Sequence, residues 1–462
     1  MQQRTIADGQ SPLSDLQPGD AAVVAEIGDL YLGGIRDLPE WAASFDLYRA
    51  EGGRVTELHL QGFDGPALDH LPESIGDLSA LRYLNISNNR ITSLPGSIGR
   101  LQNLETLIAH SLQIRGLPAE IGGLRSLTRL SLESPRLGDL PEEFGDLQAL
   151  ERLSIKSNVL RLPESFGQLS NLRELSLRAY GVSGPVRGTL DPLPKSLARL
   201  PRLESLEISG YILRELPTNL GDLQRLHALK LRRNQLQRLP ESLGQLESLR
   251  DLDLGYNKLR TLPESIGSLS SLQVLYLWGN RLSSLPESFG QLASLRDLQL
   301  QWNQIGSLPE SFGGLQQLET LHLQNNELTV LPESFGDLQR LKDLHLQNNR
   351  LTALPESFGD LQRLEALNLS ENFDLALPES FGGLQHLKYL NLASDRDAAT
   401  WRFPGSLAGL VSLEEFQLPE RALPGLPADA GLLVGRGTDF FDSRRERTLN
   451  QEVLEITGHV PG

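Results

Sequence analysis

The stretch LPESFGDLQRLKDLHLQNNRLTA, residues 331–353, decides the fold of this chain of 462 residues. The segments 308–330 and 354–376 are close copies of it, so a unit returns every 23 residues. Two intervals depart from this period, with 22 residues from Leu140 to Leu162 and 31 from Leu162 to Leu193. A fixed period of roughly 20 to 50 residues indicates stacked units rather than one globular core. Leu-Pro opens the units at Leu71, Leu94, Leu117, Leu140, Leu162, Leu193, Leu216, Leu239, Leu262, Leu285, Leu308, Leu331, Leu354 and Leu377.

Each unit contains one segment with the pattern of a half-buried strand. Leu344 and Leu346 are two residues apart, so their side chains point to the same side of an extended segment. A single strand cannot bury them, but the next unit can cover them with equivalent leucines in a parallel sheet with strands about 4.8 Å apart. Residues 343, 345 and 347 then face solvent. The repeat therefore predicts a sheet with one buried and one open face.

Turn residues flank the predicted strand on both sides. Asn349 follows it, and its amide can satisfy backbone groups that the turn leaves unpaired. Pro332 removes an amide donor and disfavours helix for the preceding residue, and Gly336 permits a tight bend. We therefore expect an extended piece and a short helical turn opposite the sheet. Stacked units should place the asparagines in a ladder of Asn234, Asn257, Asn280, Asn303, Asn326, Asn349 and Asn372.

This unit resembles the 23-residue leucine-rich repeat, LPxxhGxLxxLxxLxLxxNxL, over roughly residues 55–420. It is most similar to the repeats of intracellular Ras-group and Shoc2-type proteins and of bacterial relatives, and we interpret the chain as bacterial. The resemblance implies an α/β fold, a curved leucine-rich-repeat solenoid (horseshoe). Its parallel β-sheet would line the concave face, with short helical or extended segments on the convex face. Such a fold serves many functions, so the resemblance indicates a class of recognition proteins rather than one activity.

The sequence divides into four parts around the repeats. We expect a flexible N-terminus over 1–19, a helical N-terminal cap over 20–54, the solenoid over 55–420, and a C-terminal cap and tail over 421–462. Caps are expected because the ends of a solenoid would otherwise expose its apolar core. Trp41, Phe45 and Tyr48 are interpreted as core of a second short cap helix. The longer unit carries an insertion at 179–192, which we expect to form a loop on one rim.

Composition excludes several classes of function. The chain has 59 acidic and 43 basic residues, a formal net charge of −16, which disfavours nucleic-acid binding. It has no cysteine, hence no disulfide framework, and this favours a reducing compartment. We see no signal peptide and no apolar run of about 18 residues, so we expect no membrane insertion. The predicted location is cytoplasmic, with secretion into a host cell as the alternative.

The sequence contains no motif for catalysis or a cofactor. Neither a phosphate-binding Gly-rich loop nor a His-Glu-x2-His pair is present, so we expect no enzyme and no cofactor. His322 and His345 occupy one repeat position in adjacent units, with Asp297 and Asp343 nearby, and such groups can bind zinc. Near-identical repeats also copy an exposed histidine without a function, and no third fixed ligand is evident. The sequence therefore predicts no metal site.

The open face of the units between 249 and 302 is rich in aromatic residues. Tyr and Trp are enriched at the centres of protein interfaces. Two alternatives stay open: the rings stack on one another across strands, or they form a platform for carbohydrate. The predicted partner-binding residues are Tyr256, Tyr276, Trp278 and Trp302, with Arg232, Arg233, Asp251, Asp253 and Asp297 at the rim.

These observations predict a function in recognition. We expect a monomeric, non-enzymatic protein–protein recognition scaffold, with signalling among its possible roles, that binds a protein partner on the concave face. The alternatives are a secreted bacterial effector acting on a host protein, a self-associating structural scaffold, and a carbohydrate-binding module.

Overall fold

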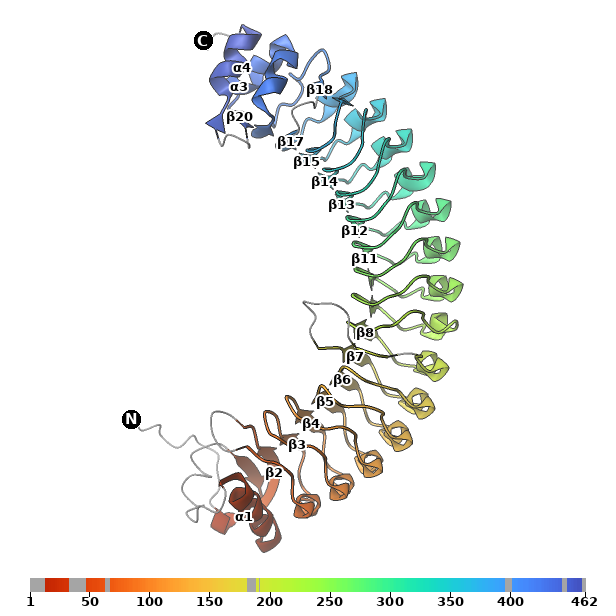
Figure 1. The fold of residues 1–462 in the computed structure, drawn as a ribbon, viewed down its shortest axis with the longest axis vertical. Coiled ribbons are helices and arrows are strands. Elements are labelled where there is room, and N and C mark those ends of the chain that lie inside the picture. Colours follow the sequence, from red (N-terminus) through yellow and green to blue (C-terminus); the bar gives the residue numbers. More distant parts are fainter. Residues whose placement is uncertain are drawn as a thin grey trace, which may run out of the picture. The chain divides into compact units, whose positions relative to one another are not determined.

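A computed structural model describes residues 13–32, 47–62, 67–180, 188–190, 192–394, 401–442 and 447–458 (Figure 1). The chain forms two compact units, Met1–Ala228 and Leu229–Gly462, which we treat separately. Several predicted features lie outside the described residues. They are the first twelve residues of the flexible N-terminus, the cap segment with Trp41 and Phe45, and most of the 179–192 insertion.

The first unit begins with a 310 helix and an α-helix and continues with strands and 310 helices. Its elements are η1 (Leu13–Asp15), α1 (Pro18–Leu32), β1 (Tyr48–Glu51), β2 (Arg54–His59), η2 (Glu73–Asp77), β3 (Tyr83–Asn85), η3 (Gly96–Arg100), β4 (Thr106–Ala109), η4 (Ala119–Gly123), β5 (Arg129–Glu133), η5 (Glu142–Asp146), β6 (Arg152–Lys156), η6 (Glu164–Gln168), β7 (Glu174–Arg178), η7 (Lys195–Arg199), β8 (Ser205–Ser209) and η8 (Leu220–Asp222). The boundary between the units falls within β9 (Ala228–Lys230).

The second unit continues the alternation and ends in a mixed segment. Its elements are η9 (Glu241–Gln245), β10 (Asp251–Asp253), η10 (Glu264–Ser268), β11 (Val274–Tyr276), η11 (Glu287–Gln291), β12 (Asp297–Gln299), η12 (Glu310–Gly314), β13 (Thr320–His322), η13 (Glu333–Asp337), β14 (Asp343–His345), η14 (Glu356–Asp360), β15 (Ala366–Asn368), β16 (Leu375–Ala376), η15 (Glu379–Gly383), β17 (Tyr389–Asn391), β18 (Trp401–Arg402), β19 (Glu415–Gln417), η16 (Glu420–Gly425), η17 (Ala428–Ala430), α3 (Gly431–Gly435), β20 (Asp439–Asp442), β21 (Arg447–Thr448) and α4 (Asn450–Thr457).

The strands of successive repeats pair in parallel with one register. Leu344 faces Leu321 on one neighbouring strand and Leu367 on the other, and Leu344 and Leu346 are fully buried. His345, next to both, lies on the open face and is partly exposed. In each unit the strands line the inner side of the coil and the 310 helices the outer side (Figure 1). The predicted repeat fold, a parallel sheet opposite short helical segments, is confirmed.

The predicted asparagine ladder holds the turns together. Asn303 shows the pattern: its Nδ2 donates to the carbonyls of Leu277 at 3.0 Å and Leu300 at 2.9 Å. Its Oδ1 accepts from the Leu282 amide at 3.0 Å. One side chain thus satisfies backbone groups of two successive repeats, which is the role that its place after the strand predicts.

The outer face is stacked as tightly as the sheet. Pro309 is extended (φ −68°, ψ 153°) and η12 follows, as the sequence predicts. The phenylalanine of this segment forms a second stack that the repeat pattern did not predict. Phe312 and Phe335 lie parallel, with ring centroids 6.1 Å apart, and both are fully buried.

The predicted role of Gly336 in the backbone is wrong. A Cβ there would lie 2.2 Å from the Ser357 carbonyl oxygen, so the glycine permits close packing of neighbouring helices rather than a bend.

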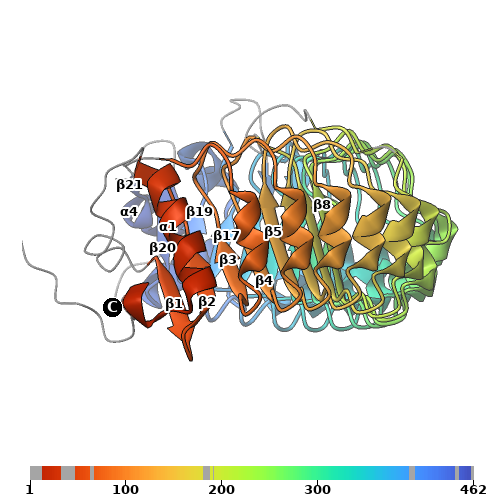
Figure 2. The same cartoon turned by 90° about the horizontal axis from the view of Figure 1, so that it is seen from below.

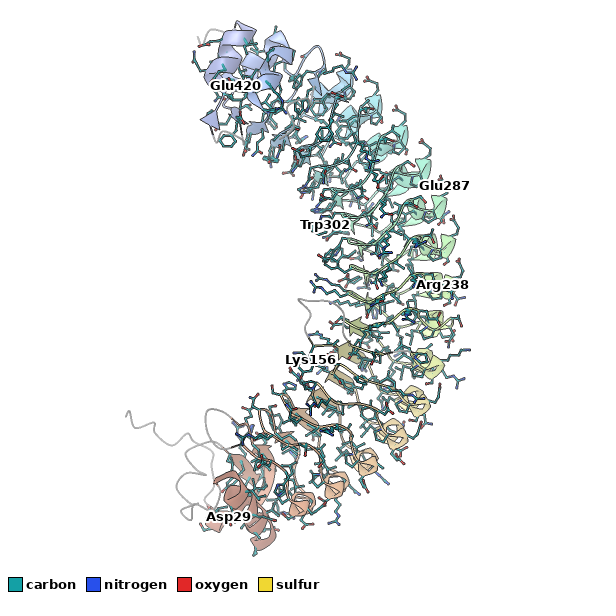
Figure 3. All side chains as sticks on the ribbon, in the orientation of Figure 1. Asp29, Lys156, Arg238, Glu287, Trp302 and Glu420 are labelled. Carbon is teal, nitrogen blue, oxygen red and sulfur yellow. The ribbon has the colours of Figure 1, made fainter. Side chains whose placement is uncertain are left out.

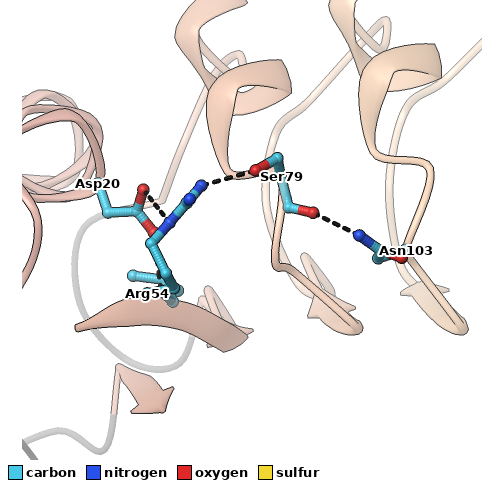
Figure 4. Close-up of polar contacts among 5 residues, drawn as sticks. Asp20, Arg54, Ser79 and Asn103 are labelled. Carbon is cyan, nitrogen blue, oxygen red and sulfur yellow. Dashed lines mark hydrogen bonds and ion pairs between the residues drawn. The ribbon is translucent and has the colours of Figure 1, made fainter. Parts of the chain in front are cut away.

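A buried carboxylate joins the N-terminal helix α1 to β2 (Figure 4). Asp20 of α1 accepts hydrogen bonds from Arg54 Nε at 3.1 Å and from the Val55 amide at 2.8 Å. Arg54 also donates to Ser79 Oγ at 2.6 Å. In the first unit α1 lies beside the row of 310 helices (Figure 2). Tyr48, expected in a cap helix, instead opens β1, which pairs antiparallel with β2.

The parallel ladder of the second unit continues past residue 420. β20 pairs in parallel with β19, which places Phe440 opposite Phe416, with ring centroids 5.1 Å apart. Both rings are fully buried, so this part of the C-terminal segment covers the end of the core. Among the described residues no helix combines the length and apolarity that a membrane span requires.

Candidate partner-binding face

The predicted site residues gather on the open face of β10, β11 and β12 in the second unit. The register places Asp251 beside Val274, Val274 beside Asp297, and Asp253 beside Tyr276. Tyr256 and Trp302 follow their strands by three residues. Figure 3 shows Trp302 on the strand side of the coil, and Arg238 and Glu287 on the side of the 310 helices.

The backbone at three of these residues is left-handed. Arg233, Tyr256 and Trp302 have φ values of 57°, 53° and 57° and occupy one repeat position, directly before the ladder asparagine. Glycine and asparagine adopt this conformation most readily, and Gly279 and Asn325 hold it in other repeats. A tyrosine or tryptophan there costs on the order of 1 kcal/mol or more. The chain thus places large side chains where the backbone favours small ones.

The rings contact one another and form a continuous surface, which we call the aromatic cluster (Tyr256, Trp278 and Trp302). The Tyr256 and Trp278 centroids are 4.3 Å apart in an edge-to-face arrangement, and those of Trp278 and Trp302 are 6.0 Å apart. The rings therefore do stack across strands, as one alternative reading of the sequence expected. Trp302 is nevertheless 50% exposed and Tyr256 41%, so much of the cluster faces solvent.

Two arginines lie against these rings. The guanidinium carbon of Arg232 is 4.4 Å from the Trp278 ring centroid, and that of Arg233 is 5.1 Å from the Tyr256 centroid. The attraction between a cation and an aromatic face holds each arginine in place and covers part of each ring. The predicted rim arginines are thus part of the surface itself.

Two glycines that were not predicted as site residues make room for the cluster. A Cβ at Gly255 would lie 2.8 Å from Cε2 of Trp278, and one at Gly279 would lie 2.8 Å from Cδ1 of Tyr256. The sequence does contain a sign of them, because the neighbouring repeats carry residues other than glycine at the equivalent positions.

Gly279→Ala is expected to lower the free energy of unfolding by about 1 kcal/mol. The reasons are its φ of +68° and the clash of the new methyl group with the Tyr256 ring. Denaturant melts of both proteins measure the loss. The matched control is Gly306→Ala, because a Cβ at Gly306 meets nothing within 4 Å. Equal stability of the two variants would show that the Tyr256 ring does not lie against Gly279.

Carboxylates surround the fourth predicted aromatic residue. The Tyr276 hydroxyl donates to Asp297 Oδ2 at 3.0 Å. Burial, this hydrogen bond, and the charges of Asp297, Asp253 and Asp251 raise the pKa of Tyr276 to about 12. Within the described residues neither Asp251 nor Asp297 forms an ion pair with a basic side chain, so this part of the face is negatively charged.

Tyr276 should ionise well above the ordinary pKa of tyrosine, about 10. The folded chain raises this pKa, so the protonated Tyr276 hydroxyl contributes to the free energy of unfolding. This contribution is complete below about pH 10 and is lost as the pH rises towards 12. The ultraviolet absorbance of tyrosinate, compared between the native chain and Tyr276→Phe, isolates this group. A difference titration with a midpoint near pH 10 would contradict the environment described.

His322 and His345 also lie side by side on this face. The His322 and His345 rings stack with centroids 4.4 Å apart and an interplanar angle of 11°. Asp343 Oδ1 lies 3.1 Å from His345 Nε2. Burial and the neighbouring His345 lower the pKa of His322, and the hydrogen bond from His345 lowers that of Asp343. Asp297, the other carboxylate named for this pair, instead accepts from Tyr276.

The open face of the first unit has a different character. An open hollow of about 290 Å³ lies over β5 to β8, with arginines, serines and glutamates around it. Its charges are largely paired: Arg152 contacts Glu174 at 3.3 Å, and Arg178 contacts Glu207 at 2.6 Å. Paired charges offer less to a partner than exposed rings, so the aromatic cluster is the stronger candidate.

Sequence comparison identifies the repeats. The pattern described as leucine-rich repeat region matches residues 54–213 and 288–352, and the pattern described as leucine rich repeat matches 201–259, 260–305 and 339–396. The search of curated proteins finds no match.

Solved structures with the same architecture come from distant organisms. A leucine-rich-repeat protein of Leptospira interrogans is 34% identical, with a TM-score of 0.65, over 80% of this chain and 92% of that one. Toll of Drosophila, solved in complex with Spätzle, is 22% identical with a TM-score of 0.63, over 77% of this chain and 50% of that one. An internalin of Listeria monocytogenes is 20% identical with a TM-score of 0.51, over 90% of this chain and 99% of that one. The similarity to Toll and to the internalin shows a shared fold and nothing more.

Proposed function

Because this chain belongs to the leucine-rich-repeat proteins, whose fold is in general a protein-interaction scaffold, we propose that it is a non-enzymatic recognition protein. Its partner is a protein that binds the open strand face of the second unit, with the aromatic cluster at the centre. The location we propose is the cytoplasm, and the repeat type is the intracellular Ras-group kind.

One observation carries this proposal. Tyr256 and Trp302 adopt left-handed backbone conformations and remain 41% and 50% exposed. Their contacts with Trp278 and Arg233 leave much of each ring in water, and the left-handed backbone still disfavours a large side chain at both positions. Strain of this kind persists in proteins mostly where it serves a site. Exposed Trp and Tyr on a rigid sheet, with arginines beside them, have the composition of an interface centre.

The charges around the cluster indicate the chemistry of the partner. Asp297 accepts from the Tyr276 hydroxyl and the charge of Asp251 acts on the same group, and within the described residues neither carboxylate forms an ion pair with a basic side chain. A partner segment with an apolar side chain against Trp302 and a lysine or arginine towards these carboxylates would complement the surface in both respects. Charge complementarity of this kind sets orientation and raises the association rate.

A carbohydrate partner fits the cluster less well. A sugar ring stacks on an open aromatic face, whereas Arg232 covers Trp278 at 4.4 Å and the Tyr256 ring meets it edge-on at 4.3 Å. Trp302 is the remaining ring that could serve. Light scattering tests self-association, because it separates a monomer from an assembly.

Selection from a displayed peptide library on the immobilised full chain tests the proposal. We expect enriched peptides that combine an apolar or aromatic residue with Lys or Arg, and we expect these peptides to bind Trp302→Ala at least about 10-fold more weakly. The matched control is Gln291→Ala at the end of η11, which is exposed on the opposite side. Peptides that bind Trp302→Ala as tightly as the native chain would contradict the proposed site.

A further inference from the structure

Three metal-ligating side chains converge on the open face at β13 and β14. His322 and His345 are paired in register on these parallel strands, so their rings face each other with centroids 4.4 Å apart. Asp343 projects on the same side of β14, two residues before His345, and its Oδ1 lies 3.1 Å from His345 Nε2. One ligand atom from each of the three residues lies within 4.8 Å of the other two.

We infer that His322, Asp343 and His345 form a binding site for a divalent transition-metal ion, with zinc as the best-matched ion. Two imidazole nitrogens and one carboxylate oxygen are ligands that zinc favours, at about 2.0 to 2.2 Å. Tetrahedral coordination at these lengths separates neighbouring ligand atoms by about 3.3 Å. The distance between Asp343 and His345 is already 3.1 Å. The ligand atom of His322 lies within 4.8 Å of these two. Because the two rings stack at an interplanar angle of 11°, metal binding requires the His322 ring to turn until its nitrogen lone pair points at the ion.

Neighbouring groups orient the imidazoles for this role. The side-chain amide nitrogen of Gln324 lies 3.3 Å from His322 Nδ1. If the amide is turned over, its oxygen, which has no hydrogen-bond partner within the described residues, accepts from Nδ1–H and leaves Nε2 for a ligand bond. Such outer hydrogen bonds are a regular feature of metal-binding histidines. Nδ1 of His345 is buried and has no hydrogen-bond partner within the described residues. Because the ligand atom of His345 is Nε2, this nitrogen is expected to be satisfied by a water molecule rather than by the ion.

This inference revises the expectation from the sequence, which found two histidines but no third fixed ligand. The short contact between Asp343 and His345 supplies that ligand. Three ligands leave one coordination position for a water molecule. The proposed protein partner is not needed for this binding, and the two proposals fail independently.

Calorimetric titration of the metal-free full chain with zinc chloride tests the site. We expect one equivalent to bind, and we expect His322→Ala, His345→Ala and Asp343→Asn each to weaken binding at least about 10-fold. His386→Ala is the matched control, since His386 is exposed on the same unit but outside the cluster. Cobalt chloride gives a second readout, because the chain has no cysteine and a tetrahedral visible spectrum must come from nitrogen and oxygen ligands.

Several outcomes would overturn the inference. Absence of saturable binding, or equal loss in the His386 variant, would show that the three residues form no site. Unchanged affinity in Asp343→Asn would show that the carboxylate is not a ligand. Zinc should also raise the melting temperature of the native chain but not of His345→Ala, since an ion that binds only the folded state stabilises it. Circular dichroism melts without metal establish that each variant is folded.

Discussion

Leu344→Ala is expected to lower the free energy of unfolding by about 2–5 kcal/mol. Leu344 is fully buried between Leu321 and Leu367 in the parallel ladder. Its truncation removes apolar contacts with both neighbouring repeats and leaves a cavity that the stacked leucines cannot fill without shifting. Denaturant melts followed by circular dichroism measure the difference.

The control for this prediction is the residue one step before it. Asp343 lies on the open face, and its contact with His345 involves side chains that are 41% and 28% exposed. Exposed pairs contribute little, so Asp343→Ala should change the free energy of unfolding by about 0.5 kcal/mol at most. Similar losses for the two variants would overturn the assignment of buried and open faces.

The repeat made most of this fold predictable. Residues two apart on a strand share a face, so the spacing of Leu344 and Leu346 was enough to predict burial of both. The position of Asn349 after the strand likewise predicted its hydrogen bonds. Its Nδ2 reaches the carbonyls of Leu323 and Leu346 at 3.0 and 2.9 Å. Such features depend on one repeat and its copies, and a 23-residue period defines both.

Features that depend on contact between particular repeats were harder to predict. The stacking of Phe312 on Phe335 requires the distance between adjacent 310 helices, which the pattern does not contain. The space that Gly255 and Gly279 leave for rings is visible only once those rings are placed. The same holds for the third group beside the histidines, because the side-chain conformation of Asp343 decides whether it reaches His345.

The second large effect is expected for binding. Trp278→Ala should weaken the partner by about 2 kcal/mol or more, roughly 30-fold in the dissociation constant. Trp278 lies between Tyr256 and Trp302 and beneath Arg232, so its removal withdraws support from both exposed rings. The side chain is only partly buried, and the hydrophobic core beneath it is unchanged. The variant should therefore unfold cooperatively, as a circular dichroism melt will verify.

The central claim is that the aromatic cluster is where the partner binds. The most direct measurement is the dissociation constant of a selected peptide for the native chain, Trp278→Ala and Gln291→Ala, under identical salt conditions. The account predicts a loss of roughly 30-fold for Trp278→Ala and no change for Gln291→Ala. Equal affinity for all three proteins would contradict it and would direct the search to the 179–192 insertion or the C-terminal segment.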